Sequence, residues 1–255
     1  MQYPTSRSPK SDTKALAVVH QPAAQAPAVA VGGVRPVVPS ASAPQALEMR
    51  LKRLLDLIGA FTGLVLLGPL MTAITILIGV DSPGPALFKQ RRFGRGGSPF
   101  TFYKFRTMFD GNDPKLHREF VSKLINGEAQ EGLRGANGSL KIENDPRVTR
   151  LGRVLRRTSL DELPQLINVL KGDMSLVGPR PPVHYEIEMY QPEHLRRLDV
   201  LPGMTGLWQV SGRTQTGFDE MVALDQEYIE TWSLWLDVKI LWRTIFVVLS
   251  RKGAW

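Results

Sequence analysis

An uninterrupted apolar run constrains this chain more than any other feature. Residues 57–80, LIGAFTGLVLLGPLMTAITILIGV, are 24 consecutive positions without a charged side chain. A straight helix of that length rises ~36 Å at 1.5 Å per residue, which is enough to cross a hydrocarbon core of ~30 Å. A buried helix of a soluble protein is the alternative, but soluble helices this long normally carry a polar face. The run therefore predicts a membrane segment.

A proline near the middle of the run argues against a straight span. Pro69 follows Gly68, and a proline there removes a backbone hydrogen bond and clashes with the preceding turn. Each half of a helix broken there is too short to cross the bilayer. Cations flank both ends: Arg50, Lys52 and Arg53 before the run, and Lys89, Arg91, Arg92 and Arg95 after it. Because such cations favour the cytoplasmic side, we expect a re-entrant helix with both ends on that side; a kinked spanning helix is the alternative.

The composition excludes several classes of protein. With 43% hydrophobic and 22% charged residues, the 255-residue chain is not disordered as a whole. The absence of cysteine excludes disulfides, cysteine-ligated zinc, iron–sulfur clusters and thiol catalysis. The four histidines are scattered and expected at the surface, so any metal must be held by oxygen ligands. The net charge of +8 favours a phosphate-bearing ligand or anionic lipid, and without a nucleic-acid-binding motif we expect no nucleic-acid partner.

The chain divides into three segments. Residues 1–46 are rich in alanine and proline, which predicts a disordered tail, and they lack the apolar core of a signal peptide. Residues 47–82 are the predicted re-entrant membrane helix. Residues 83–255 form the predicted domain on the cytoplasmic face, which carries the chemistry.

A β-hairpin is predicted at the start of that domain. Residues 87–108 alternate partly between apolar and polar side chains around a GRGGSP centre. Lys104 and Arg106 are two positions apart, so on a strand both side chains point to one face. The pair fits a phosphate site, or a basic surface facing solvent or membrane, and the spacing does not distinguish the two.

Two helices are predicted over the C-terminal stretch 219–251. The second, over residues 232–252, mixes three tryptophans with cations around an apolar body. This mixture is typical of an amphipathic helix at a membrane interface, and a core helix with a charged edge is the alternative.

The segment 145–182 carries the clearest chemical signal. It begins with a basic run in which several arginines lie three positions apart and so share a helix face: Arg147, Arg150, Arg153, Arg156 and Arg157. The adjacent acid pair Asp161 and Glu162 follows. A stiff GPRPP turn that carries Arg180 completes the segment.

The acid pair has a structural and a chemical interpretation. Ser159 and Glu162 fit a capping box that opens a helix over residues 162–171, with Asp161 as an alternative cap before Pro164. A carboxylate at a helix start beside cations also stays ionised at neutral pH. It can then act as a nucleophile or as a Mg²⁺ ligand.

Several motifs occur together in this chain: YKFRTM (103–108), NDPRVTRLG (144–152), RRTSLDELPQLINVLKGDMSLVGPRP (156–181) and PGMTGLWQVSGR (202–213). With these motifs, residues 50–255 resemble the bacterial sugar transferases, the monotopic phosphoglycosyl transferases that load a sugar-1-phosphate onto a polyprenyl phosphate. The chain is most similar to the short members that start exopolysaccharide synthesis. The resemblance implies a mainly helical α+β monotopic membrane protein with a proline-broken re-entrant helix, interfacial amphipathic helices and a small β-hairpin.

The resemblance also implies roles for individual residues. The family's catalytic acid pair falls on Asp161 and Glu162, and its phosphate-contacting arginine falls on Arg156. The break in the membrane helix falls on Pro69, where Gly68 replaces the serine that other members often have. Further phosphate or nucleotide contacts are expected from three cations: Arg180, Lys104 and Arg106.

The implied reaction transfers a sugar-1-phosphate from a UDP-sugar to undecaprenyl phosphate and releases UMP. We expect Asp161 to attack the β-phosphate and form a covalent aspartyl-phosphosugar intermediate, which the lipid phosphate then resolves. Mg²⁺ is the expected cofactor, held by Asp161 with Glu162. A second interpretation makes Glu162 the acceptor of the lipid phosphate's proton.

The expected partners are therefore a UDP-sugar, undecaprenyl phosphate and membrane lipid, at the cytoplasmic face of the bacterial inner membrane. Direct displacement in a ternary complex is an alternative mechanism. A non-enzymatic protein that binds anionic lipid is an alternative function. The sequence leaves open which sugar is carried, and it leaves open the oligomeric state, a homo-oligomer included.

Overall fold

The structure, a computed structural model, describes residues 43–111, 115–126, 145–212 and 216–250. The predicted tail over residues 1–46 lies almost wholly outside this part of the chain. Its last four positions, 43–46, belong instead to the first helix, which moves the predicted boundary towards the N-terminus.

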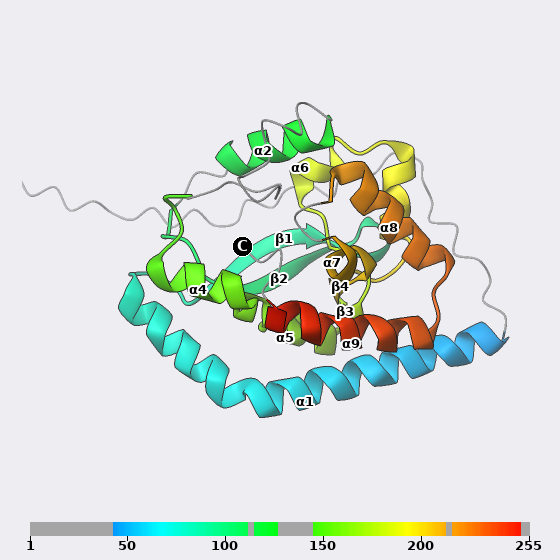
Figure 1. Cartoon of the computed structure of the whole chain (residues 1–255), viewed down its shortest axis with the longest axis horizontal. Helices are drawn as coiled ribbons and strands as arrows, with labels where there is room; N and C mark the ends of the chain where they lie inside the picture. Colours follow the sequence, from blue (N-terminus) through cyan, green and yellow to red (C-terminus); the bar gives the residue numbers. More distant parts are fainter. Residues whose placement is uncertain (1–42, 112–114, 127–144, 213–215, 251–255) are drawn as a thin grey trace, which may run out of the picture. The chain divides into compact units, whose positions relative to one another are not determined.

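The described part is mainly helical, with two small sheets (Figure 1). Strands β1 and β2 pair antiparallel, and β3 and β4 pair parallel. The elements follow in this order: α1 (Ala43–Asp81), β1 (Leu87–Phe93), η1 (Arg95–Gly97), β2 (Pro99–Phe105), α2 (Lys115–Ile125), α4 (Arg150–Thr158), η2 (Leu160–Glu162), α5 (Gln165–Lys171), β3 (Ser175–Val177), α6 (His184–Ile187), η3 (Pro192–Leu198), β4 (Gly203–Thr205), α7 (Leu207–Ser211), α8 (Phe218–Glu230) and α9 (Leu234–Ser250).

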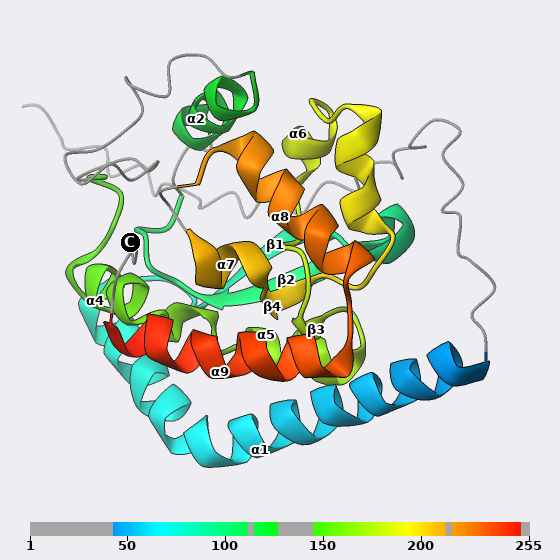
Figure 2. The same ribbon diagram turned by 45° about the vertical axis from the view of Figure 1, so that its right-hand side comes forward.

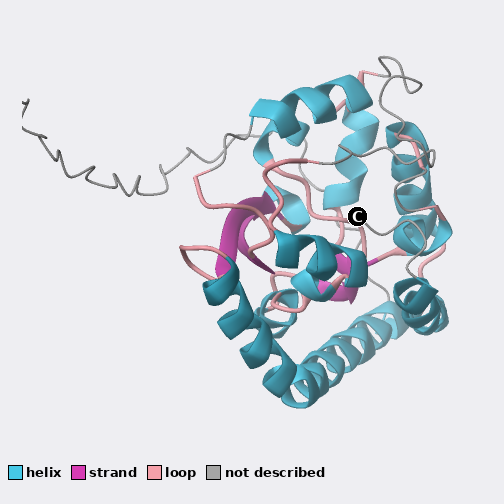
Figure 3. Ribbon diagram, turned by 60° about the vertical axis from the view of Figure 1, so that its left-hand side comes forward, coloured by secondary structure: helices cyan, strands magenta, loops and turns pink. Residues whose placement is uncertain are grey.

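Helix α1 contains the predicted membrane segment and continues through Pro69. The helix is bent in the part that is drawn cyan in Figures 1 and 2, and Figure 3 shows the same bend from a third direction. Pro69 lies in this part and accounts for the bend, because proline cannot complete the helical hydrogen bonding. By length and composition α1 can cross a membrane, and many of its large apolar side chains are exposed.

The predicted hairpin is confirmed by the pairing of β1 with β2, which runs from Leu87 opposite Phe105 to Phe93 opposite Pro99. Gly96 and Gly97 in the connecting turn have φ angles of 68° and 71°. Glycine adopts this left-handed conformation without a steric penalty, so the GRGG sequence suits a tight turn. The hairpin runs through the middle of the domain (Figures 1 and 2).

Helix α1 packs against this domain through two apolar clusters. They join it to β2, α4 and α5, and each large buried side chain contributes ~1.5–3 kcal/mol. The first cluster contains Ala60, Phe102, Leu166, Val169 and Met174, and the second contains Ile74, Ile78, Phe105 and Leu155.

The two predicted C-terminal helices are confirmed as α8 and α9. Helix α9 runs beside the first half of α1 (Figures 1 and 2). It exposes a row of large apolar side chains: Trp235, Trp242, Ile245, Phe246 and Leu249. Its other side packs into a cluster with β3 and α8 through Ile240.

A glycine sets how closely α4 approaches the segment after β2. A Cβ on Gly152 would lie 2.0 Å from the carbonyl oxygen of Thr107. The Gly152→Ala variant should therefore lose about 1–3 kcal/mol in free energy of unfolding, measured by chemical denaturation in detergent. Gly79→Ala is the matched control, because nothing lies within 4 Å of its added Cβ. Equal stability of the two variants would contradict the close approach.

Candidate active site

A cavity of about 240 Å³ lies where β2, η2 and the turn after β3 meet. Five of the six predicted catalytic or phosphate-binding side chains line it, although they come from separate parts of the chain: Lys104, Arg156, Asp161, Glu162 and Arg180. An apolar wall from α2, α7 and α8 faces them and includes Phe120, Trp208, Phe218 and Met221. The cavity thus combines three carboxylates, of Asp161, Glu162 and Glu186, and several cations with an apolar side.

Asp161 is the most buried charged group among these predicted residues, with 2% of the residue exposed. Its Oδ2 atom lies 2.6 Å from Nζ of Lys104 on β2. Helix α4 ends just before it, and Ser159, with a φ angle of 57°, turns the chain into η2. This sharp reversal directs the Asp161 carboxylate towards the hairpin.

The capping interpretation of the acid pair is wrong. The Ser159 side chain makes no capping hydrogen bond, and it ends α4 rather than opening the next helix. Helix α5 begins at Gln165, with Pro164 before it. Asp161 and Glu162 lie in the short 3-10 turn between the helices, so helix capping does not account for a buried acid pair at this place.

Glu162 is in a different electrostatic environment from an ordinary glutamate. Burial raises the pKa of its carboxyl group, and the neighbouring Asp161 carboxylate raises it further. Lys104, Arg180 and Arg92 act in the opposite direction. Glu162 therefore keeps its proton to a higher pH than an exposed glutamate, a property of groups that exchange protons near neutral pH.

Two half-buried arginines line the cavity with the acid pair. The Nε–H group of Arg156 on α4 donates to Thr107 Oγ1 at 2.8 Å. Burial lowers the pKa of Arg156, and Asp161 opposes this effect. Arg180 lies in a turn that two backbone hydrogen bonds make rigid, from Gly178 N to Thr205 O at 2.9 Å and from Gly203 N to Pro179 O at 2.8 Å. The Arg156 guanidinium is thus held by Thr107, and the backbone around Arg180 is held by β4.

Arg106 does not join this site. Its guanidinium donates to the carbonyl oxygen of Ser82 at 2.6 Å and also to that of Pro83, so it holds the chain just after α1. Strand β2 ends at Phe105, and the alternation that should place Arg106 beside Lys104 does not extend past it. The predicted phosphate pair is therefore reduced to Lys104.

Sequence reasoning missed two further arginines that line the cavity, Arg92 and Arg197. Arg92 on β1 is buried, donates from Nη1 to the Pro181 carbonyl at 2.9 Å, and stacks 4.1 Å from the ring centroid of Phe102. Burial lowers its pKa to about 10, and Arg180 contributes to this shift. For Arg92, the sequence signal was only the general basicity of the hairpin.

The prediction that all the histidines lie at the surface is wrong for the described chain. His194 is 7% exposed and accepts a hydrogen bond from Gln191 N. His117 on α2 lines the cavity and hydrogen-bonds to the Tyr185 hydroxyl. Burial and nearby arginines lower the pKa of His117 to about 4, so it is neutral at physiological pH. His20 lies outside the described residues.

Two polar atoms in the cavity wall have no hydrogen-bond partner among the described residues. They are the indole Nε1 of Trp208 and the hydroxyl oxygen of Thr216. A buried donor or acceptor without a partner costs ~1–3 kcal/mol, so such groups commonly mark a place where a polar ligand binds.

The donor set at the site is compatible with Mg²⁺. No group of three or more acidic or histidine side chains is arranged to hold a metal in the described part of the chain. Mg²⁺ often takes only one or two carboxylates and completes its coordination with substrate phosphates and water. The adjacent carboxylates of Asp161 and Glu162 fit that pattern.

The fold and the cavity define a class of protein, a domain with one helix apolar and long enough to cross a membrane and with an acidic group at a cation-rich pocket. The model of the family described as "Bacterial sugar transferase" matches residues 47–251. The chain belongs to this family.

Three relatives illustrate the match. The "Galactosyl transferase CpsE" of Streptococcus agalactiae is 48% identical over 205 residues, covering 80% of this chain and 43% of the relative. The "Exopolysaccharide production protein ExoY" of Rhizobium meliloti is 42% identical, covering 80% and 88%. The "UDP-glucose:undecaprenyl-phosphate glucose-1-phosphate transferase" of Caulobacter vibrioides is 42% identical, covering 82% and 73%. The chain thus spans less than half the length of CpsE and most of the length of ExoY.

Proposed function

We propose that this chain transfers a sugar-1-phosphate from a UDP-sugar to undecaprenyl phosphate and releases UMP. The observation that carries the proposal is the buried ion pair between Asp161 and Lys104, which lies at a cavity that Arg156 and Arg180 also line. The printed name of the Caulobacter relative describes this reaction with glucose, and that of the Streptococcus relative names galactose, so a hexose is the expected sugar.

The first step forms a covalent intermediate on Asp161. A carboxylate oxygen attacks the β-phosphorus, the bond from that phosphorus to the bridging oxygen breaks, and UMP leaves with the electron pair. In the second step an oxygen of the lipid phosphate attacks the same phosphorus. The bond to Asp161 then breaks, which restores the carboxylate and completes the lipid-linked diphosphate.

The surrounding side chains have separate tasks in this scheme. Lys104 orients the attacking carboxylate, and Arg156 and Arg180 stabilise charge on the phosphoryl oxygens. Glu162, whose pKa is raised, accepts the remaining proton of the lipid phosphate. When Mg²⁺ is bound, Asp161 would hold it, and it would neutralise the charge of the diphosphate. In the other interpretation Glu162 would hold Mg²⁺ together with Asp161 and would not take up the proton.

The membrane placement follows from the acceptor, whose phosphate stays at the bilayer surface. The bend of α1 and the cations that flank its uncharged run support a re-entrant helix, with the site on the cytoplasmic face of the inner membrane. The exposed aromatic side chains of α9, Trp235 and Trp242, support contact with the membrane interface.

The proposal is tested by UMP release from detergent-purified protein with Mg²⁺ and a panel of UDP-sugars, each with and without undecaprenyl phosphate. Release that requires one sugar and the lipid would support the reaction and identify the donor. No release with any sugar, together with no Mg²⁺-dependent binding of UDP-sugars, would favour the anionic-lipid-binding alternative.

A related experiment distinguishes the two-step mechanism from direct displacement. Labelled UMP is incubated with unlabelled UDP-sugar and protein in the absence of lipid. Exchange of label into the UDP-sugar requires a covalent intermediate, so the two-step mechanism predicts exchange. Direct displacement in a ternary complex predicts none.

The unpartnered indole of Trp208 gives a prediction about donor binding. Trp208→Phe keeps an aromatic ring but removes the N–H group, so the KM for the UDP-sugar should rise about tenfold, the cost of ~1.4 kcal/mol for one lost hydrogen bond. The measurement is UMP release against UDP-sugar concentration. Trp235→Phe is the matched control, because Trp235 is 64% exposed on α9. An unchanged KM in Trp208→Phe would show that the indole does not bind the donor.

A further inference from the structure

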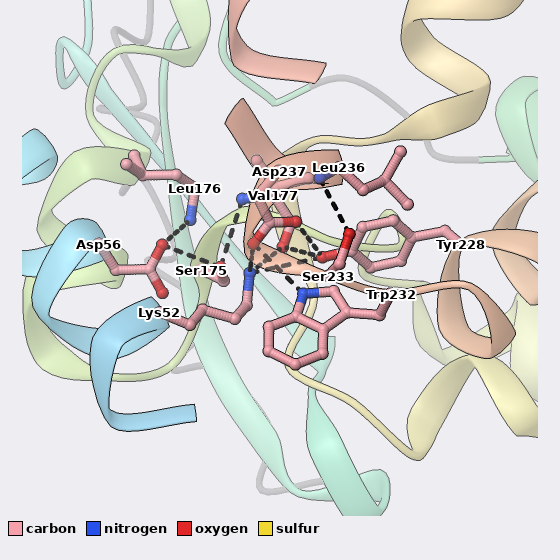
Figure 4. Close-up of polar contacts among 10 residues, drawn as sticks. All are labelled: Lys52, Asp56, Ser175, Leu176, Val177, Tyr228, Trp232, Ser233, Leu236 and Asp237. Atoms are coloured by element: carbon pink, nitrogen blue, oxygen red, sulfur yellow. Dashed lines mark hydrogen bonds and ion pairs between the residues drawn. The ribbon is translucent and has the colours of Figure 1, made fainter. Parts of the chain in front are cut away.

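A buried polar cluster outside the cavity joins α1 to three other elements (Figure 4). Nζ of Lys52 lies 2.6 Å from Oδ2 of Asp237 on α9, and it donates to the Val177 carbonyl at 3.1 Å. The Tyr228 hydroxyl on α8 donates to Oδ1 of Asp237 at 2.8 Å and lies 3.1 Å from the same carbonyl oxygen. Trp232 adds an N–H contact to Asp237 at 3.3 Å. We call this group, with Lys52 at its centre, the Lys52 cluster.

Two further polar side chains of α1, Arg53 and Asp56, form hydrogen bonds with α5 and β3. Oδ1 of Asp56 accepts hydrogen bonds from Ser175 Oγ at 2.9 Å and from Leu176 N at 2.8 Å. Arg53 donates to the carbonyl oxygens of Val169 and Leu170 at 2.7 and 3.0 Å. One short stretch of α1 therefore binds both β3 and the C-terminal end of α5.

Both of these elements lead directly to the candidate active site. Helix α5 follows the turn that carries Asp161 and Glu162. Strand β3 ends at Val177, whose carbonyl Lys52 and Tyr228 contact, and the next residues form the turn with Arg180. Lys52 and Asp237 do not line the cavity themselves.

The Lys52 cluster is better suited to fixing the position of α1 along the domain than to adding to the stability of the fold. A buried ion pair loses much of its Coulomb energy to desolvation, so it adds little net stability, and its best-attested use is to select one arrangement. The apolar contacts that hold the rest of α1 are non-directional. A slip of α1 by one helical turn, ~5.4 Å, would separate Lys52 from Asp237 and leave each buried charge without its counter-ion.

We propose that the Lys52 cluster sets the register of α1 against the catalytic domain and thereby the height of Asp161 relative to the membrane. Lys52 and Asp237 are then positioning residues for the reaction with the lipid acceptor. This inference rests on the proposed function, because height matters only if one substrate is confined to the bilayer. The soluble UDP-sugar reaches the cavity at any height, so the two half-reactions should respond differently.

The decisive variant is Lys52→Met/Asp237→Leu, which replaces the ion pair by apolar side chains of similar size and leaves Tyr228 its bond to Val177. We expect UMP exchange without lipid to stay within about twofold of wild type, while the KM for undecaprenyl phosphate rises about tenfold. The single variant Lys52→Arg keeps the cation beside Asp237, so its KM for undecaprenyl phosphate should stay close to the wild-type value. The matched control is Arg196→Met/Glu230→Leu, an exposed ion pair at 2.9 Å, which should change neither quantity.

A second measurement follows the register without using activity. The chain has no cysteine, so spin labels attach only at introduced cysteines. Labels at Leu54 on α1 and Glu220 on α8, both exposed, report the distance between the helix and the domain in lipid nanodiscs. The wild-type distribution should be narrow, and that of the double variant should broaden or shift by up to one helical turn. Asp237→Asn is a milder change that can be used if the double variant does not fold. It should also raise the KM for undecaprenyl phosphate and broaden or shift the distance distribution.

The outcomes separate the two proposals. A raised acceptor KM together with a broadened distance distribution supports the register proposal. Wild-type acceptor kinetics and a wild-type distance distribution in the double variant would overturn it. A wild-type protein without UMP exchange for any UDP-sugar would overturn the proposed function, and the distance measurement would still decide whether the Lys52 cluster sets the register.

Discussion

Replacing Asp161 by asparagine should abolish UMP release, with a loss in kcat/KM of at least ~10³-fold. Asparagine has nearly the same shape, so the turn between α4 and α5 should persist. A neutral amide does not attack phosphorus as a carboxylate does, and the substitution also removes the negative partner of Lys104, which lies 2.6 Å away. The initial rate of UMP release with UDP-sugar, measured with and without undecaprenyl phosphate, tests this expectation.

The control for this variant is the same change at an exposed aspartate. Asp219 lies in the first turn of α8 and faces solvent, so Asp219→Asn should behave as wild type. UMP exchange without lipid should disappear only in Asp161→Asn. Full activity of Asp161→Asn would eliminate Asp161 as the nucleophile, and retained function that depends only on the surface cations would favour a lipid-binding protein.

The Lys104→Met substitution has the second-largest expected effect, a loss of about 10²-fold or more in kcat/KM. It leaves the buried Asp161 carboxylate without its cation, and an unpaired buried charge is strongly unfavourable. The Asp161 carboxylate also loses the cation that orients it for attack on phosphorus. The measurement is the initial rate of UMP release against UDP-sugar concentration, which gives kcat/KM.

Two further lysine variants test whether the effect is specific to the position and to the positive charge of Lys104. Lys89 on β1 is exposed, so Lys89→Met should have wild-type activity. Lys104→Arg keeps the positive charge and should retain more activity than Lys104→Met, with a loss from the changed geometry. If Lys104→Met kept the wild-type kcat/KM, the ion pair with Asp161 would have no part in the reaction.

The elements with strong local patterns were predictable from the sequence. The uncharged run around Pro69 indicated a membrane helix broken at the proline, whereas α1 continues through Pro69 with a bend. The glycine-rich centre of 87–108 indicated a hairpin. These signals depend on residues close together in the chain, so no tertiary contact is needed to interpret them. The start of α1 was missed by four residues, because the end of an alanine- and proline-rich stretch carries no distinct boundary signal.

The candidate site was predictable only in part. The acid pair and Arg156 lie in one continuous motif, and the structure brings them to the same cavity as Lys104 and Arg180. Strand spacing failed for Arg106, because the strand ends one residue earlier and the side chain binds carbonyl groups just after α1 instead. The capping interpretation failed because the left-handed conformation of Ser159 ends one helix instead of starting another.

The sequence alone thus determined the apolar helix, the hairpin, the C-terminal helix pair and the motif that contains Asp161, since each is encoded by neighbouring residues. The tertiary structure alone decided which cations face Asp161, that His117 is neutral beside arginines, and that Lys52 is paired with Asp237. The two members of that pair are separated by most of the described chain. Burial and pairing of this kind depend on how distant segments pack, and short-range sequence patterns contain no information about that packing.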